Sequence, residues 1–390
     1  MLTLGLMLAL AEAGSYLLGK YYIPRSALSF TLYDPHYRPK AAEIERYFAQ
    51  RDSVLGWPPR DAYGGELYDR RGARPLPAFP DADADACVSL YGDSYTYSSY
   101  VGPADAWGNL LAGHLGCRVA NYGVSGYGTD QALLRFVRGD EDGSGIVILG
   151  IATVDIIRLV NQDRRLIWNS RSGPLLKPRY ALGADGRLRL IGLPAVTAAD
   201  LDEYARHPER YLHHEWFLPD TPDGPVTLRV PYSISLVRGL MLPRVWNKLA
   251  GKPSWIEFYD ARHGSGALPL LVGICREFVR VAEERGKRPL IVVIPTSQDL
   301  WHARDTGSNP SAPLLDALRR QSIEPIDVLP AMLRHVGDRD VCEIFGEKTW
   351  LGYCWGHYTP EGERVIATSV QENLGPANAM SWTGAEAAER

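Results

Sequence analysis

The sequence has little excess charge and few cysteines. Its 390 residues carry 42 basic and 46 acidic side chains, a formal net charge of −4, so charge gives no reason to expect a nucleic-acid partner. The five cysteines include no CxxC pair, which argues against a zinc site. His213, His214 and Glu215 are metal-binding residue types, but no spaced partner accompanies them. The sequence implies no metal and no cofactor.

The cysteines that do occur lie far apart in the chain. Cys87 and Cys275 lie in apolar runs and are expected to be small core residues. Cys342 and Cys354 could form a disulfide if the protein is exported, because disulfides persist in oxidising compartments.

The segment 1–19 is almost entirely apolar and contains one charged residue, Glu12. Its length is close to the roughly 20 residues that cross a bilayer. No basic residue precedes it, whereas Lys20 and Arg25 follow it, which by the positive-inside rule would keep the body of the protein cytoplasmic. We interpret residues 1–20 as an apolar membrane anchor or signal-like helix. The alternative is an amphipathic helix buried within the protein.

An α/β pattern starts at residue 86, after a polar, proline-bearing segment 21–85 that we interpret as linker and peripheral loops. Short apolar runs without alternation predict strands that are buried on both faces, at 87–91, 118–122, 146–151, 289–294 and 325–329. Helical patterns are found at 105–115, 129–138, 270–285, 312–320 and 360–373. This alternation predicts a three-layer α/β/α sandwich with a parallel, flavodoxin-like sheet.

The segment 160–265 interrupts this rhythm. A structureless loop of that length is uncommon, so we expect an inserted cap or subdomain within the domain 86–375. A hairpin-like stretch at 180–190 lies inside the insertion, and the tail 376–390 is expected to be disordered.

Ser94 is the first candidate for chemistry. It ends the tripeptide Gly92-Asp93-Ser94 directly behind a predicted strand, where a following helix begins. The unpaired amides and partial positive charge of a helix N-terminus suit a developing oxyanion. The alternative is a serine that only caps this helix.

Two further strand ends fall at the same predicted sheet edge. The glycine-rich stretch 121–130 lets the backbone approach a ligand, and the amide of Gly126 could be a second oxyanion donor. Asp155 follows the third strand and could face the same site, or it could cap a helix.

His357 belongs to the segment 356–362 (GHYTPEG), in which Thr359 and Pro360 are typical of a helix start. This places the histidine on a loop just before the last helix. An imidazole there can act as the base for a distant serine nucleophile.

Together these segments resemble the SGNH/GDSL hydrolase superfamily, over roughly residues 87–160 and 285–375. Block I of that family is matched by Gly92-Asp93-Ser94, the block II glycine by Gly126, and the block V histidine by His357. The resemblance is to branches found with bacterial cell-surface polysaccharide modification. It implies that Ser94 is the nucleophile, that His357 is the base, and that the amides of Ser94 and Gly126 hold the oxyanion.

The chain departs from the family pattern at two positions. The block III asparagine, a third oxyanion donor, is replaced in a stretch that carries Val154 and Asp155, and an ionised aspartate only accepts hydrogen bonds. Cys354 stands where the family has the aspartate that orients the histidine. The orienting acid is then missing, replaced by a carbonyl group, or supplied from elsewhere in the chain, with Asp327 and Glu343 as candidates. With Asp93, these departures make Asp155 and Cys354 candidate site-lining residues.

We therefore expect an acyl-ester hydrolase or O-acetyltransferase that acts on an acylated carbohydrate of the cell surface or on another ester substrate. We expect it to be anchored to the membrane or exported in a bacterial cell envelope. A cytoplasmic location is the alternative. The rival functions are a catalytically degenerate glycan-binding or scaffolding protein on the same fold, and an unrelated flavodoxin-like domain in which Ser94 and His357 lie far apart. The oligomeric state is not indicated.

Overall fold

The computed structural model describes residues 2–139, 143–168, 175–348 and 354–374. The chain divides into two compact units. The sheet unit contains residues 58–159 and 180–189 and continues from residue 256. The helical unit contains the chain up to residue 57, together with 160–179 and 190–255. The tail 376–390 lies outside the described residues.

The sheet unit is built on five parallel strands in the order β3-β2-β4-β8-β9. Their bounds are Val119–Asn121 for β3, Val88–Tyr91 for β2, Ile146–Ala152 for β4, Arg288–Ile294 for β8 and Ile326–Asp327 for β9. All seven residues of β4 are buried, because helices cover both faces of the sheet. The predicted parallel α/β sandwich is confirmed, and each strand falls within a segment predicted from the sequence or within one residue of it.

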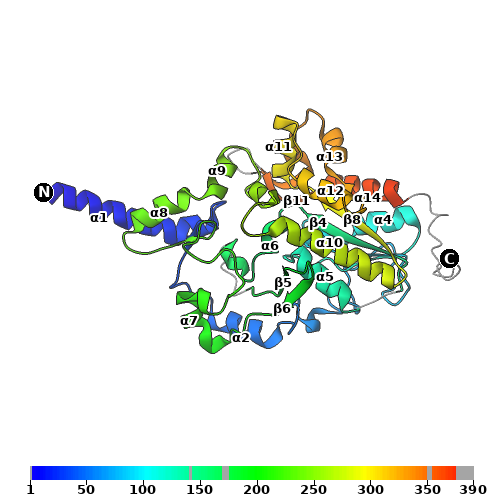
Figure 1. Cartoon of the computed structure of the whole chain (residues 1–390), viewed down its shortest axis with the longest axis horizontal. Coiled ribbons are helices and arrows are strands. Elements are labelled where there is room, and N and C mark those ends of the chain that lie inside the picture. The colour runs from blue at the N-terminus through cyan, green and yellow to red at the C-terminus, as the bar shows by residue number, and fades with distance from the viewer. Residues whose placement is uncertain (1, 140–142, 169–174, 349–353, 375–390) are drawn as a thin grey trace. The chain divides into compact units, whose positions relative to one another are not determined.

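The helices that cover the sheet also match the predicted segments. They are α4 (Trp107–Leu115), α5 (Thr129–Val137), α10 (Ala267–Glu284), α12 (Ala312–Arg319) and α14 (Pro360–Leu374). Helix α10 packs against α5 and α12, whereas α14 packs against α4 (Figure 1). Right-handed crossovers put α5, α10 and α12 on one face of the sheet and α4 on the other, and α14 packs on α4.

The strand order determines where a ligand site can form. The first strand of the sheet, β2, lies between β3 and β4, so the chain leaves β2 to one side and later returns on the other. In open α/β sheets, ligands bind at the carboxyl ends of the strands beside such a reversal. Ser94 follows β2 and Asp155 follows β4, so both candidate residues come directly after the two strands that flank this point.

The helical unit combines the early part of the chain with the segment that interrupts the α/β pattern. Its longer helices are α1 (Leu2–Leu17), α2 (Ala41–Gln50), α7 (Leu201–Arg206), α8 (Tyr232–Leu240) and α9 (Pro243–Leu249). Strand β1 (Leu32–Tyr33) pairs in parallel with β7 (Val226–Thr227). Beside this pair, Ile23, Leu32, Val226 and Leu228 form a buried apolar cluster. Residues 21–57 are thus not only linker, because their apolar side chains pack on residues of the interrupting segment.

Helix α1 lies in the segment that we interpret as an anchor. It has 16 residues and continues as a π-helix over Leu18–Tyr22. Among the described residues, no helix combines the length and the apolar character needed to cross a membrane. The predicted hairpin at 180–190 forms the two-stranded sheet of β5 (Arg179–Leu182) and β6 (Leu188–Ile191).

Four of the five cysteines are paired. Cys87 forms a disulfide with Cys117, and Cys342 forms one with Cys354. The prediction that Cys87 is only a small core residue is wrong, because Cys87 is bonded to Cys117. Cys117 lies just before β3, and the two Cα atoms are 6.1 Å apart. Cys275 is free and buried, as predicted.

Candidate active site

Ser94 lies on a tight turn between β2 and a short helix. Helix α3 covers Ser94–Tyr97, so Ser94 is its first residue. The turn is compact because Gly92 has no side chain: a Cβ atom there would lie 2.6 Å from Thr96 Cβ and 2.8 Å from the carbonyl oxygen of Gly150. Only glycine allows β2, α3 and the middle of β4 to approach this closely.

Asp93 caps this helix, so the interpretation of Ser94 as the capping residue is wrong. The carboxylate of Asp93 accepts a hydrogen bond from the amide of Tyr95 at 2.8 Å. The hydroxyl of Ser94 is buried and donates to Asp93 Oδ2 at 3.4 Å. Because Asp93 satisfies the helix N-terminus, the Ser94 side chain is not needed for capping.

Arg158 joins Asp93 and Asp155 in a buried ion-pair cluster. Its Nη1 atom donates to Asp93 Oδ2 at 2.9 Å, to Asp155 Oδ1 at 2.6 Å and to the carbonyl oxygen of Tyr127 at 2.8 Å. Burial by itself would lower the pKa of Arg158, but the charges of Asp155 and Asp93 outweigh this effect and raise it. The guanidinium therefore stays charged and balances both carboxylates.

This cluster shows how the negative charge of Asp155 is balanced. Neither of its two predicted roles describes it fully: it makes no side-chain cap at the start of α6 (Asp155–Arg158), and its negative charge is paired with Arg158. A paired carboxylate opposes a nearby oxyanion much less than a bare one. The asparagine position of block III is occupied by Val154, which is buried and offers no donor.

His357 lies on strand β11 (Cys354–Tyr358) and not on a loop, which corrects the prediction. Strand β11 pairs antiparallel with β10 (Phe345–Lys348). The imidazole is held between two phenol rings, with centroid distances of 4.5 Å to Tyr95 and 4.7 Å to Tyr100. Tyr95 directly follows Ser94, so the serine turn and the histidine strand are neighbours in the sheet unit.

A hydrogen bond reinforces this contact. The hydroxyl of Tyr95 donates to the carbonyl oxygen of Gly356 at 3.0 Å. Tyr100 lies against the same hairpin, because a Cβ atom on Gly356 would come within 2.6 Å of its ring. Sequence reasoning missed both tyrosines and the ion pairs of Arg158. The signals for them were the place of Tyr95 beside the nucleophile and the i,i+3 spacing of Asp155 and Arg158.

The imidazole of His357 makes no hydrogen bond through either ring nitrogen within the part of the chain that the structure describes. It is therefore not hydrogen-bonded to Ser94 or to an acid there. Burial lowers the pKa of His357 to about 4, against a smaller raising effect of the Asp93 charge, and Arg158 lowers it further. The ring is neutral at pH 7 and is able to accept a proton.

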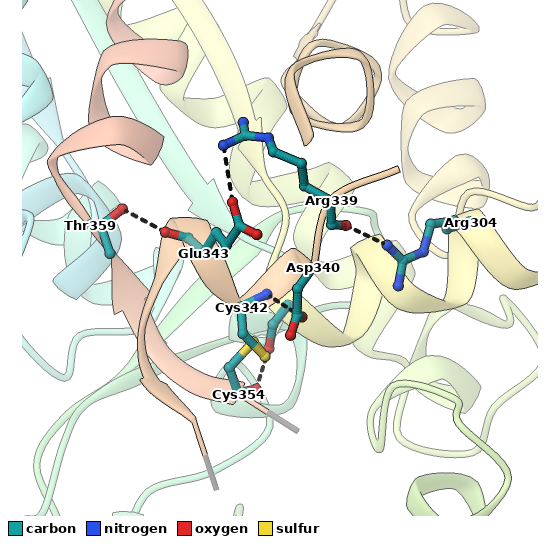
Figure 2. Close-up of a disulfide and its surroundings, with 8 residues drawn as sticks. Arg304, Arg339, Asp340, Cys342, Glu343, Cys354 and Thr359 are labelled. Carbon is teal, nitrogen blue, oxygen red and sulfur yellow. Dashed lines mark hydrogen bonds and ion pairs between the residues drawn. A yellow bond between two sulfur atoms is a disulfide. The ribbon is translucent and has the colours of Figure 1, made fainter. Parts of the chain in front are cut away.

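The candidates for an orienting acid do not serve this histidine. Cys354 is bonded to Cys342 and carries no ionisable thiol (Figure 2). Asp327 accepts a hydrogen bond from Asn309 Nδ2 at 2.9 Å, and Glu343 pairs with Arg339 Nη1 at 3.1 Å. Neither carboxylate is bonded to His357, so both proposals for the triad acid are wrong.

The strand that carries His357 is instead fixed by several other bonds. The disulfide ties the start of β11 to Cys342, whose amide donates to Asp340 at 2.9 Å (Figure 2). The hydroxyl of Ser297 donates to the carbonyl oxygen of Cys354 at 2.7 Å. At the other end of β11, Thr359 donates to the carbonyl oxygen of Glu343 at 3.5 Å. These bonds restrict the backbone of the histidine in the absence of a hydrogen bond to its ring.

The block II segment is anchored against the same turn. Asn121 donates through Nδ2 to the carbonyl oxygen of Thr96 at 2.7 Å and accepts through Oδ1 from the amide of Gly123 at 2.9 Å. Gly126 follows in this loop with φ of +88°, in the left-handed region that favours glycine. Asn121 thus links the loop of the second predicted oxyanion donor to the helix that begins at Ser94.

The region around His213 has a structural role in the helical unit. Glu215 accepts hydrogen bonds from the amide of Phe217 at 2.9 Å and from the amide of Asp163 at 3.1 Å. Burial raises the pKa of Glu215, against the lowering effect of these bonds. No group of His, Cys, Asp and Glu side chains within residues 2–139, 143–168, 175–348 and 354–374 is arranged to hold a metal ion.

Comparisons with known proteins give structural likenesses only. No family model and no curated protein matches the chain. A structure of a putative lipolytic protein of the G-D-S-L family from Desulfitobacterium hafniense is similar, at 10% identity and a TM-score of 0.32 over 73% of this chain and 97% of that chain. A second member of that lipolytic family, from Veillonella parvula, is similar at 11% identity and a TM-score of 0.33 over 73% and 96%. An α/β hydrolase from the metagenome of Lake Arreo is similar at 13% identity and a TM-score of 0.36 over 76% and 96%.

These TM-scores are low, so we base the family resemblance on the motifs and on their places in the sheet unit. Ser94 and Asp155 follow the two strands beside the strand-order reversal, and His357 packs on the residue next to Ser94. In its motifs, in their order along the chain and in its parallel sheet, the chain resembles the SGNH/GDSL hydrolase superfamily.

Proposed function

We propose that the protein is a serine-dependent acyl-ester hydrolase or acyltransferase. The observation that carries this proposal is the packing of His357 on Tyr95, which places a neutral imidazole beside the turn of Ser94. A neutral imidazole next to a serine at a helix N-terminus supplies a base, a nucleophile and amide donors in one place.

In the proposed mechanism the Ser94 oxygen bonds to the ester carbonyl carbon while its proton passes to His357. The carbonyl oxygen becomes an oxyanion, which accepts hydrogen bonds from the amides of Ser94 and Gly126. The ester C–O bond then breaks, and His357 returns the proton to the departing alcohol. Water, or the hydroxyl of an acceptor, then attacks the carbonyl carbon of the acyl-enzyme while its proton passes to His357. The bond to the Ser94 oxygen breaks, and His357 returns the proton to Ser94.

The mechanism can operate without an acid bonded to His357 among the described residues. The neutral imidazole can accept the serine proton, although no such carboxylate stabilises the imidazolium that forms. In serine-protease triads, disabling the acid costs on the order of 10⁴ in rate and leaves catalysis well above that of water. The bonds that fix β11 take over part of the orienting role, and a hydrogen bond between Ser94 and His357 is expected to form when a substrate is bound.

The bond that we propose for cleavage or transfer is an O-acetyl ester on a cell-surface glycan. The choice of acyl group follows from the family resemblance. Tyr100 adds a local reason, since its ring contacts His357 and is 48% exposed. An exposed aromatic face beside the base is suited to contact a sugar ring.

We place the protein in a bacterial cell envelope. The four paired cysteines support this location, because disulfides persist in oxidising compartments and are rare in the cytosol.

A glycan-binding or scaffolding protein on the same fold is the second candidate. Two observations favour it: Val154 stands at the position of the third oxyanion donor, and Cys354, at the acid position, is closed in a disulfide. Such a protein would keep the geometry of the site and would not turn over an ester.

Hydrolysis of a p-nitrophenyl acetate series separates these candidates. Turnover that falls by at least about 10³ in both Ser94→Ala and His357→Ala supports the pair. The matched control is His114→Ala, at an exposed histidine on α4. Activity that is unchanged in Ser94→Ala would contradict the mechanism. A silent parent is next tested for acetyl transfer from an acetylated glycan to an acceptor and for glycan binding, since binding without turnover would favour the second candidate.

A further inference from the structure

The helical unit exposes an unusual number of apolar side chains. Of the 21 large hydrophobic side chains that are exposed among the described residues, 16 lie in the two segments 4–22 and 230–249. Large contiguous apolar patches on a protein surface mark sites of interaction, whereas scattered ones do not. These two segments are therefore expected to bind another molecule or a membrane.

Helix α1 is apolar around its whole circumference. Leu4, Leu6, Met7, Leu8 and Leu10 are each at least 60% exposed. Successive residues of a helix are about 100° apart, so these five positions span about 200° of the circumference. Gly5 and Ala9 are also exposed and lie in the remaining arc. A helix that is apolar on every side requires an apolar environment on every side. One protein partner would cover only one face, whereas lipid can surround the helix.

Helices α8 and α9 have an apolar face of the ordinary amphipathic kind. Ile234, Val237 and Met241 are spaced by three and four residues and are exposed, whereas Ser235 and Gly239 are buried. Trp246 continues the exposed apolar positions on α9. Nine-residue and seven-residue helices cannot cross a bilayer, but amphipathic helices of this type lie in the interface.

Helices α1 and α8 are parts of one surface. They lie side by side in Figure 1 and are in contact. Glu12, the one charged residue of α1, accepts hydrogen bonds from the amides of Tyr232 at 2.6 Å and Ser233 at 3.2 Å. The carboxylate thus caps the N-terminus of α8, where it is favoured by the helix dipole. The rest of α1 is left without charge.

Basic residues predominate in the two chain segments that carry this surface. No acidic residue occurs between Glu12 and Asp34, where Lys20 and Arg25 lie. None occurs from residue 224 to residue 256, a stretch that contains five basic residues, namely Arg229, Arg238, Arg244, Lys248 and Lys252. In the structure Lys20 pairs with Asp34, Arg229 and Arg238 pair with Asp220, and Arg244 is buried. Arg25 and Lys252 are exposed and can complement the anionic headgroups of a membrane.

We propose that α1, α8 and α9 together form a membrane-binding surface, in which α1 enters the hydrocarbon and the apolar faces of α8 and α9 lie in the interface of a bilayer that contains anionic lipid. At 1.5 Å per residue, α1 is about 24 Å long and the hydrocarbon core is about 30 Å thick. The sequence alone predicted a membrane role for residues 1–20 only. The new element of the proposal is that α8 and α9, which lie in the segment 160–265, also bind the membrane. This inference is independent of the chemistry at Ser94.

The test is sedimentation of the full chain with vesicles, made of phosphatidylcholine alone or with one quarter phosphatidylglycerol. We expect the parent to bind the mixed vesicles, and to bind the neutral ones at least about tenfold more weakly. The combined substitutions Ile234→Glu, Val237→Glu and Trp246→Glu should weaken binding at least about tenfold although α1 is intact. The matched control is Leu67→Glu, Leu182→Glu and Leu190→Glu, at exposed apolar positions outside the surface, and should bind like the parent.

Circular dichroism checks that each variant is folded. A parent that ignores both kinds of vesicle would overturn the proposal, and a dimeric mass in solution would then assign the surface to a second copy of the chain. A parent that binds equally well after the three substitutions on α8 and α9 would also overturn it, since α1 would then act alone. Equal binding to neutral and anionic vesicles would show that the basic residues do not contribute to membrane binding.

Discussion

The phenol ring of Tyr95 lies against the imidazole of His357, with 4.5 Å between the ring centroids. Tyr95 comes from the turn behind β2 and His357 from the last strand of the chain. The same phenol donates a hydrogen bond to Gly356, so one buried side chain holds the two halves of the candidate site together. The rival view, a generic domain in which Ser94 and His357 lie far apart, does not agree with this contact.

Substitution of Tyr95 by Phe tests this link. It removes the hydroxyl that satisfies the Gly356 carbonyl and should lower the free energy of unfolding by about 1–3 kcal/mol. It should also lower kcat, because the histidine strand is held less firmly. The control is Tyr97→Phe, which removes a comparable hydrogen bond to the Leu67 carbonyl at 3.0 Å. Denaturant unfolding and ester kinetics should show a loss of stability in both variants and a loss of kcat in Tyr95→Phe alone. Equal kcat in the two variants would contradict the link.

The pH dependence of activity should report the buried state of His357. Burial lowers its pKa from an ordinary 6.5 to about 4, so the imidazole remains a base well below neutral pH. The acid limb of kcat/KM should therefore lie near pH 4. Between pH 6.5 and 4 the unfolded chain binds a proton at this position that the folded chain does not, so stability should fall as the pH falls through this range. A limb at pH 6.5 in protein that is still folded would show that the imidazole is solvated.

Arg158 should be essential for the fold around the site. Arg158→Met leaves the buried carboxylates of Asp93 and Asp155 without their counter-charge, and loss of one partner of a buried ion pair costs about 3–5 kcal/mol. Arg280→Met breaks surface pairs with Glu277 and Glu284 and should cost less than about 1 kcal/mol. Urea unfolding of the two variants gives the comparison. Similar losses would mean that the cluster is hydrated.

The Cys342–Cys354 disulfide should matter for catalysis as well as for stability. Replacement of both cysteines by Ala frees the start of the strand that carries His357, whose ring nitrogens make no hydrogen bond within the described residues to compensate. The matched control is the double replacement of Cys87 and Cys117, before β2 and β3. Each change should cost about 2–4 kcal/mol of stability. Only the first should lower kcat at a temperature where both variants are folded, and equal kcat values would argue against a positioning role.

The sequence was sufficient for the five parallel strands and for most of the helices that cover them. Short apolar runs such as 146–151 predict β4 because a strand covered on both faces needs apolar residues at every position. The helix α11 (Ser297–Thr306) was missed, since few of its residues are apolar and several of its buried residues are polar. The packing of residues 21–57 was missed as well, because the pairing of β1 with β7 joins two-residue strands that are nearly 200 positions apart. Short, distant pairings leave no periodicity in the sequence.

At the site, the sequence pattern predicted Ser94 and His357 as nucleophile and base but not the residues that surround them. The charge of Asp155 looked like an obstacle because its partner Arg158 has no motif of its own, and only the turn after β4 brings the two together with Asp93. The closure of Cys354 in a disulfide was one of two outcomes that the spacing allowed, and the contact of Cys87 with Cys117 depends on the register of β2 and β3.

Labelling with a fluorophosphonate tests the central claim most directly, because this probe reports an activated serine whether the natural reaction is hydrolysis or transfer. We expect a single covalent adduct, which peptide mass spectrometry assigns to the segment with Ser94. The adduct should be absent in Ser94→Ala and should form at least about a hundredfold more slowly in His357→Ala. A parent that is not labelled, or an adduct that forms equally fast without His357, would contradict the account of Ser94 and His357 as nucleophile and base.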